Sequence, residues 1–114
     1  MSDTNLATGS VWRLHHGSHE LARLTVTGAD MPWVHATAET LPAFEDFRPL
    51  FAEQARATAR EDWERADVCF LRIREALTMT FPDGGEVAEF ALDFHDDGTA
   101  DWRWHDEPFG PDDL

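Results

Sequence analysis

Apolar and polar side chains alternate along residues 10–27, which is the period of a β-strand with one buried face. The segment 17–19, Gly-Ser-His, interrupts the alternation and predicts the loop of a β-hairpin. A two-residue loop would set Trp12 against Arg23. A three-residue loop instead pairs apolar residues, Trp12 with Leu24 and Leu14 with Ala22. Residues 33–39 are rich in β-favouring side chains and predict a third strand.

Residues 40–59 change to the spacing of an α-helix, because apolar residues recur there at intervals of three and four: Phe44, Phe47 and Phe51. Thr40 is the expected N-cap, and Pro42 suits the first helical turn. Pro49 interrupts the pattern, since a proline inside a helix removes a hydrogen bond and costs about 3 kcal/mol. We expect either a kink at Pro49, or a short turn before it followed by a main helix to about residue 59.

A second helix is predicted after a polar break, with Asp62 as its N-cap and its end near Arg74. Its inward face is expected to hold the residues that recur at helical spacing: Trp63, Ala66, Phe70 and Ile73. The two helices should form a hairpin.

From residue 76 the period returns to two, which predicts a meander of three strands. A two-residue turn at Asp83-Gly84 would join the first two strands and pair Phe81 with Glu86, Met79 with Ala88 and Leu77 with Phe90. A three-residue loop at 96–98, with Gly98 in the left-handed region, would join the last two. That loop pairs Phe94 with Ala100, Leu92 with Trp102 and Phe90 with Trp104.

The predicted order of elements is βββ-αα-βββ, and the predicted fold class is α+β, an antiparallel sheet with a helical hairpin packed on one face. The sequence pattern leaves open whether the six strands form one sheet or two. The expected domain organisation is a flexible N-terminal tail at residues 1–9, a single domain at 10–105 and an acidic, irregular C-terminal tail at 106–114.

Composition excludes several classes of protein. The chain has 114 residues, 42% of them hydrophobic, and a formal net charge of −14. It is too hydrophobic for a disordered protein, and no apolar run approaches the roughly 18 residues that span a bilayer. Its acidity argues against contact with the phosphates of nucleic acids. The start of the chain has no secretory signal and Cys69 is the single cysteine, so we expect a cytoplasmic protein. The general character of the chain is that of a small bacterial protein.

The negative charge is concentrated at the end of the chain. Residues 83–114 hold 11 acidic residues and one arginine, whereas residues 1–82 hold 12 acidic residues and 8 arginines. Such a field would speed encounters with a basic partner and repel nucleic acid.

Two segments have a partial likeness to metal sites. His15, His16 and His19 lie around the predicted turn, where the strand pattern does not give them the helical spacing of a shared zinc ion. Residues 93–101 space their acids as a calcium loop does, but His95 and Trp104 stand where that loop needs oxygen ligands. We therefore predict no metal, no cofactor and no catalytic residues.

The candidate binding residues lie mainly on the polar face of the last two strands. In the predicted register Asp93 faces Asp101, and facing like charges destabilise a sheet unless a cation or a partner compensates. In the third strand, an outward-facing Trp33 would anchor a partner or stack on a ligand. The full candidate set is Trp33, His35, Glu89, Asp93, Asp101, Arg103 and His105.

These features favour a non-enzymatic interaction module, of adaptor, inhibitor or immunity type, that binds a basic protein. One alternative is a small-molecule-binding or enzymatic domain with a pocket lined by Trp33, His35 and neighbouring aromatic residues. Another is an acidic mimic of nucleic acid. Self-association into a homodimer through an exposed sheet edge is a further option.

Overall fold

The computed structural model of the chain describes residues 6–30, 33–95 and 97–105, without the side chain of His105. The predicted tail at 106–114 lies outside these residues. The elements follow in the predicted order: β1 (Val11–His16), β2 (His19–Asp30), β3 (Trp33–Thr40), the 3-10 helix η2 (Pro42–Asp46), α1 (Arg48–Ala59), α2 (Trp63–Ala76), β4 (Thr78–Thr80), β5 (Glu89–Phe94) and β6 (Thr99–His105).

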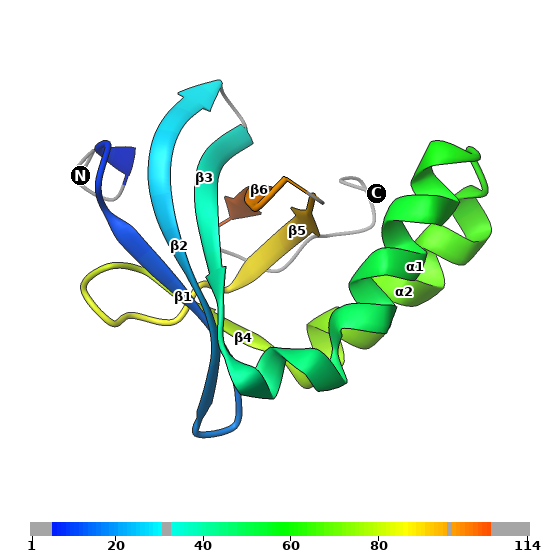
Figure 1. Cartoon of the computed structure of the whole chain (residues 1–114), viewed down its shortest axis with the longest axis horizontal. Helices are drawn as coiled ribbons and strands as arrows, with labels where there is room; N and C mark the ends of the chain where they lie inside the picture. Colours follow the sequence, from blue (N-terminus) through cyan, green and yellow to red (C-terminus); the bar gives the residue numbers. More distant parts are fainter. Residues whose placement is uncertain (1–5, 31–32, 96, 106–114) are drawn as a thin grey trace.

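All six strands join one antiparallel sheet in the order β4-β1-β2-β3-β6-β5. The two groups of strands meet where β3 pairs with β6, which places Val34 opposite Trp102 and Ala36 opposite Ala100. The predicted fold class is confirmed, since the chain is an α+β protein with an antiparallel sheet and a helical hairpin. Figure 1 shows the two helices side by side, beyond β5 at the edge of the sheet.

The sheet curls strongly around an aromatic cluster. Neighbouring strands lie about 4.8 Å apart, so β1 and β6, with two strands between them, would be roughly 14 Å apart in a flat sheet. The ring centroids of Trp12 on β1 and Trp102 on β6 are nevertheless 5.2 Å apart. Phe81 and Trp104 complete this cluster, with ring centroids 5.0 and 5.7 Å from that of Trp12. The concave face of the sheet is therefore filled largely by its own side chains.

The pairing of β1 with β2 confirms the predicted register, with Trp12 opposite Leu24 and Leu14 opposite Ala22. The three-residue loop is wrong, because His16 pairs with His19 and leaves a two-residue turn. A bulge between Leu14 and His15 shifts the register at that point. The bulge allows a tight turn and the apolar register to coexist.

β4 pairs with β1, and Met79 lies opposite Leu14. The predicted pairing of β4 with β5 is therefore wrong. A turn at 81–85 does form, in which the Phe81 N–H donates to the Gly85 carbonyl at 2.8 Å, but Thr80–Glu86 is an isolated bridge. Pairing with β1 covers an edge that β1 would otherwise expose, and it buries Met79 completely.

The pairing of β5 with β6 is as predicted, with Phe94 opposite Ala100, Leu92 opposite Trp102 and Phe90 opposite Trp104. Gly98 has a φ of 86°, which confirms the left-handed position in the connecting loop.

The first helical segment follows the second of the two expected arrangements. A short 3-10 helix precedes α1, and Pro49 lies in the first turn of α1, where its missing N–H costs nothing. Thr40 as N-cap is wrong. Thr40 is the last residue of β3 and pairs with Ala22, and Leu41 precedes the 3-10 helix without a side-chain cap.

The second helix begins at the predicted N-cap. The Asp62 carboxylate accepts a hydrogen bond of 3.2 Å from the Arg65 N–H. Ile73 is buried, but the inward position predicted for Trp63 is wrong, because 57% of its side chain is exposed. Trp63 starts α2 at the end of the helical hairpin that projects away from the sheet (Figure 1), where no strand covers it. No helix among the described residues is long and apolar enough to cross a membrane.

Candidate functional site

A row of polar residues crosses three strands on the convex face of the sheet. Asp101 of β6 lies opposite Asp93 of β5 on one side and opposite His35 of β3 on the other. The Asp93–Asp101 pair was predicted from the β5–β6 register. His35 joins it because β3 pairs with β6, which the sequence left open.

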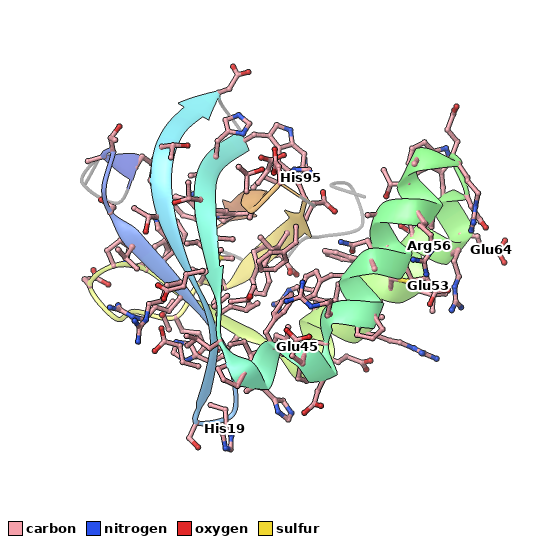
Figure 2. All side chains as sticks on the ribbon, in the orientation of Figure 1. His19, Glu45, Glu53, Arg56, Glu64 and His95 are labelled. Carbon is pink, nitrogen blue, oxygen red and sulfur yellow. The ribbon has the colours of Figure 1, made fainter. Side chains whose placement is uncertain are left out.

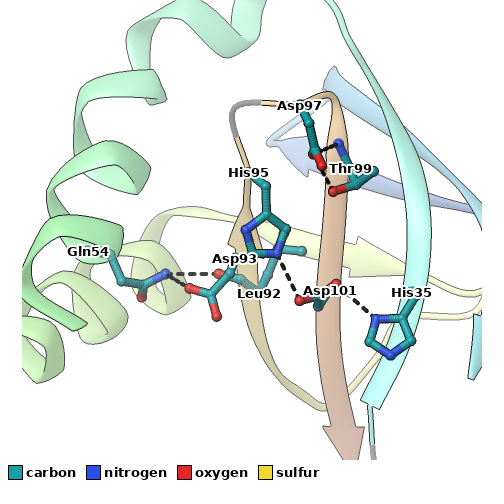
Figure 3. A network of polar contacts seen from close by, with 8 residues as sticks. All are labelled: His35, Gln54, Leu92, Asp93, His95, Asp97, Thr99 and Asp101. Atoms are coloured by element: carbon teal, nitrogen blue, oxygen red, sulfur yellow. Dashed lines mark hydrogen bonds and ion pairs between the residues drawn. The ribbon is translucent and has the colours of Figure 1, made fainter. Parts of the chain in front are cut away.

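Two histidines hold the Asp101 carboxylate (Figure 3). Nδ1 of His35 is 2.9 Å from Oδ1, and Nε2 of His95 is 2.8 Å from Oδ2. Burial acts to raise the pKa of Asp101, but the hydrogen bonds with His35 and His95 outweigh it, so this pKa is lowered. The hydrogen bond to Asp101 is in turn the main cause that raises the pKa of His95.

Asp93 has a different environment from Asp101. Its Oδ1 accepts a hydrogen bond of 2.9 Å from the side-chain amide of Gln54 on α1 (Figure 3). The pKa of Asp93 is raised, chiefly because burial disfavours the charged form; the nearby Asp101 carboxylate adds to this effect, while His95 and the hydrogen bond from Gln54 oppose it. Asp93 is thus a partly desolvated carboxylate whose hydrogen bond comes from a neutral amide.

Gln54 links α1 to the edge of β5. β5 is the last strand of the sheet, so its outward carbonyls have no partner strand. The buried Gln54 amide donates 2.9 Å hydrogen bonds to the Leu92 carbonyl and to Asp93. On α2, Arg74 donates to the Ala88 carbonyl at 3.1 Å and forms an ion pair with Glu89. The helical hairpin therefore supplies donors to two carbonyls at the open edge of the sheet.

A cleft of about 440 Å³ lies between the helical hairpin and the convex face of β5 and β6. Its lining is Gln54, Thr58, Ala66, Asp67, Phe70, Leu71, Ala91, Leu92, Asp93 and Arg103. Apolar side chains form much of the wall, and a few polar groups converge in it, which is typical of a binding site.

A smaller pocket of about 210 Å³ lies on the other side of the β5 edge. Aromatic side chains form its wall, and His95 and Arg48 supply polar groups. Three of its aromatic rings are in mutual contact, Phe44, Phe51 and Phe94, with centroids 4.7–5.5 Å apart.

The outer face of α2 exposes large apolar side chains. Trp63 is 57% exposed, Leu71 58% and Val68 37%. Exposed acidic residues accompany them on the same helix: Glu64, Asp67 and Glu75. Figure 2 shows Glu64 at the end of the hairpin, pointing away from the sheet. Arg65 and Arg74 of this helix form ion pairs with Glu53 and Glu89.

The other predicted binding residues are dispersed. Trp33 is half-buried at the start of β3, and neither cleft is lined by it or by His35. Glu89 pairs with His105 in the backbone register, as predicted, while its carboxylate forms the ion pair with Arg74. Arg103 lines the larger cleft, opposite Ala91.

The histidines near the first turn contact separate partners. His15 Nε2 is 3.2 Å from the Thr80 hydroxyl, and the ring of His16 lies against Phe47. Within residues 6–30, 33–95 and 97–105, no group of three His, Cys, Asp or Glu side chains is arranged to hold a metal ion.

Several residues of the clefts and of the exposed α2 face were not among the predicted binding set; Trp63 is one of them, because its helical spacing indicated a core position. Gln54 falls three positions after Phe51 on the apolar stripe of α1, and a polar residue on such a stripe indicates a buried hydrogen bond. Leu71 lies off the stripe of α2, which indicates a second apolar face. His95 comes directly after the strand that ends at Phe94, and no pattern in the sequence indicates its contact with Asp101.

Comparison of the chain with protein-family models, with curated proteins and with solved structures finds no match.

Proposed function

We propose that this protein is a non-enzymatic interaction module that binds a basic protein partner through the outer face of α2 and the adjoining cleft. The observation that carries the proposal is the exposure of Trp63, Val68 and Leu71 on a helix whose other exposed residues are mainly acidic. Apolar residues in an acidic surround are complementary to an amphipathic, basic segment.

Charge supports a basic partner over a second copy of the chain. Each copy carries a formal net charge of −14, so two copies repel one another, whereas a basic partner is attracted. Because Arg65 and Arg74 are held by Glu53 and Glu89, Arg72 is the one exposed arginine on α2. The face offered to a partner is therefore negative as well as apolar.

The two most exposed residues of this face are suited to anchor a partner. Trp63 and Leu71 are eight residues apart, about two helical turns, and so lie on neighbouring lines of one helix face. Large side chains that are exposed in the free protein and covered in the complex supply much of the binding energy of protein interfaces.

A selection from a displayed library of random peptides tests the proposal. The wild-type protein is the bait, and the variant with both Trp63→Ser and Leu71→Ser removes peptides that bind elsewhere. We expect enrichment of peptides in which Arg or Lys alternates with apolar residues at helical spacing. Their affinity should fall roughly tenfold between low and moderate salt, because opposite surface charges are screened.

The matched control is Ala55→Ser, which changes an exposed position on α1. It should leave peptide binding unchanged. Enriched peptides without net positive charge, or equal binding to the double variant, would contradict the proposal. A selection that enriches no sequence at all would also contradict it.

A small-molecule-binding role is the second candidate, favoured by the aromatic pocket that contains His95 and Arg48. Phenyl rings at its wall and the Arg48 guanidinium at its edge suit a small aromatic carboxylate. Titration with benzoate, followed by the NMR signals of the His95 ring, should then show saturable shifts that His95→Gln abolishes. If these shifts do not saturate at millimolar benzoate, the small-molecule-binding role is wrong.

A further inference from the structure

We infer that the cleft beside α2 receives an arginine side chain of the partner, with its guanidinium against the carboxylate of Asp93. The inference rests on the proposed function and names the group that the partner contributes. It depends on four features of the cleft: how Asp93 is held, what the walls are made of, which charged groups surround it, and where the cleft opens.

Asp93 is held in place by Gln54. The Gln54 amide fixes Oδ1 at 2.9 Å and is itself fixed by its second hydrogen bond, to the Leu92 carbonyl. A carboxylate accepts up to about four hydrogen bonds, and Asp93 receives one from a described residue. An ionised carboxylate that is partly removed from water is costly unless an opposite charge compensates. A cation in the cleft would supply that charge.

The walls favour a guanidinium over an ammonium group. Phe70, Leu71 and Ala66 form the α2 side, and Ala91 forms part of the strand side. A guanidinium is planar and weakly hydrated, stacks on aromatic rings and donates two parallel hydrogen bonds to a carboxylate. An ammonium group would lose a tightly held hydration shell on entering an apolar cleft.

The charged groups around the cleft determine where the cation sits. Asp67 lines it from α2, and Asp101 and His95 act on Asp93 from the convex face of the sheet. Arg103 lines the cleft from β6, opposite Ala91 and two residues away from Asp101. Asp93 and Asp67 are the acidic residues of the lining, and they attract an incoming guanidinium.

The cleft is continuous with the proposed binding face. Leu71 and Asp67 belong both to the exposed face of α2 and to the lining of the cleft. A basic segment that covers Trp63 and Leu71 would therefore bring its neighbouring side chains to the mouth of the cleft.

The test uses n-butylguanidinium as a probe and n-butylurea as its neutral counterpart of similar shape. In ¹⁵N NMR spectra of the full chain, n-butylguanidinium should cause saturable shifts of the Gln54 side-chain amide and of the Asp93 backbone amide. Asp93→Asn should weaken binding about tenfold or more, because it removes a charge-assisted hydrogen bond. n-Butylurea should bind no more tightly to the wild type than to this variant.

Asp46→Asn is the control, because Asp46 is an exposed acid of the 3-10 helix η2, outside both the cleft lining and the proposed binding face of α2. It should bind n-butylguanidinium as the wild type does. Equal binding to Asp93→Asn, or shifts confined to residues outside the cleft, would overturn the inference. A dispersed NMR spectrum of Asp93→Asn verifies that the variant is folded.

The peptides selected on wild-type protein separate this inference from the proposed function. Arginine-to-lysine and arginine-to-alanine changes in such a peptide should weaken binding to the wild type, and the loss should disappear in Asp93→Asn. Peptides that need Trp63 and Leu71 but ignore Asp93 would overturn the inference and leave the proposed function standing. Binding of n-butylguanidinium without enrichment of any basic peptide would overturn both.

Discussion

Asp93 and Asp101 face each other across β5 and β6, and their surroundings shift the pKa values of the two carboxyl groups in opposite directions. Two histidines bond to Asp101 and lower its pKa, against the effect of burial. Gln54 bonds to Asp93, whose pKa is raised because burial dominates. Cross-strand like charges destabilise a sheet when both are ionised and uncompensated. Here Asp101 is compensated by two histidines of the sheet, whereas Asp93 lines a cleft.

Asp93→Asn should stabilise the free protein at neutral pH. Because the pKa of Asp93 is raised in the folded state, its contribution to stability is fully present below its ordinary value of 3.8 and is lost as the pH rises through the raised pKa. The amide keeps an oxygen for the Gln54 hydrogen bond and does not ionise. The variant's free energy of unfolding should exceed that of wild type at pH 7 by up to about 1 kcal/mol.

Urea unfolding at several pH values measures this difference, which should shrink as the pH falls toward 3.8. The exposed Glu64→Gln serves as a control for loss of one negative charge. A difference that does not change with pH would show that the Asp93 carboxylate is not desolvated.

Asp101→Asn should lower the pKa of His95. The hydrogen bond to Asp101 is the main cause that raises this pKa above its ordinary value of 6.5. The contribution of His95 to stability is therefore fully present below pH 6.5 and is lost as the pH rises through the raised pKa. NMR titration of the His95 ring protons measures the change, with Glu75→Gln on α2 as a control. A His95 pKa that is equal in wild type and Asp101→Asn would contradict the hydrogen bond.

Gln54→Ala should destabilise the protein by about 1–3 kcal/mol, because the buried Leu92 carbonyl and Asp93 both lose their donor. Gln54→Glu should destabilise the protein more than Gln54→Ala does at pH 7, since it places a second carboxylate against Asp93. Thr58→Ala, four residues further along α1 and exposed, is the matched control and should change stability by less than about 0.5 kcal/mol. Chemical unfolding followed by tryptophan fluorescence measures the stability of all three variants. If Gln54→Ala loses no more stability than Thr58→Ala, Gln54 does not stabilise the β5 edge.

Gly98→Ala should lower the free energy of unfolding, whereas Gly28→Ala should leave it unchanged or raise it. Gly98 has a φ of 86°, a conformation that an alanine adopts only with strain, so its replacement should cost about 1 kcal/mol. Gly28 lies at the bulge between β2 and β3 with open space around its Cα and without a positive φ. Alanine there should be neutral or stabilise by about 0.5 kcal/mol. Thermal unfolding of both variants gives the comparison, and similar losses at both positions would contradict it.

The β5–β6 hairpin shows how far sequence alone carries a prediction. Its register follows from two local requirements that agree: a loop with Gly98 in the left-handed region, and apolar residues on one face of both strands. The Asp93–Asp101 pair followed from that register. At β4 the same kind of argument failed: the turn at 81–85 forms, but β4 pairs with β1 and not with β5, and Met79 is completely buried there.

The sequence by itself determined the order of elements, the Asp62 cap of α2, the loop with Gly98 in the left-handed region, and which residues of β5 and β6 share a face. These depend on contacts between residues close along the chain, whose geometry is set by periodicity and backbone preference. Only the tertiary structure decided that β3 joins β6, that His35 meets Asp101, and that Gln54 closes the β5 edge. Those contacts join residues 38 to 68 positions apart, and which of many such pairings forms depends on the burial of the whole chain at once.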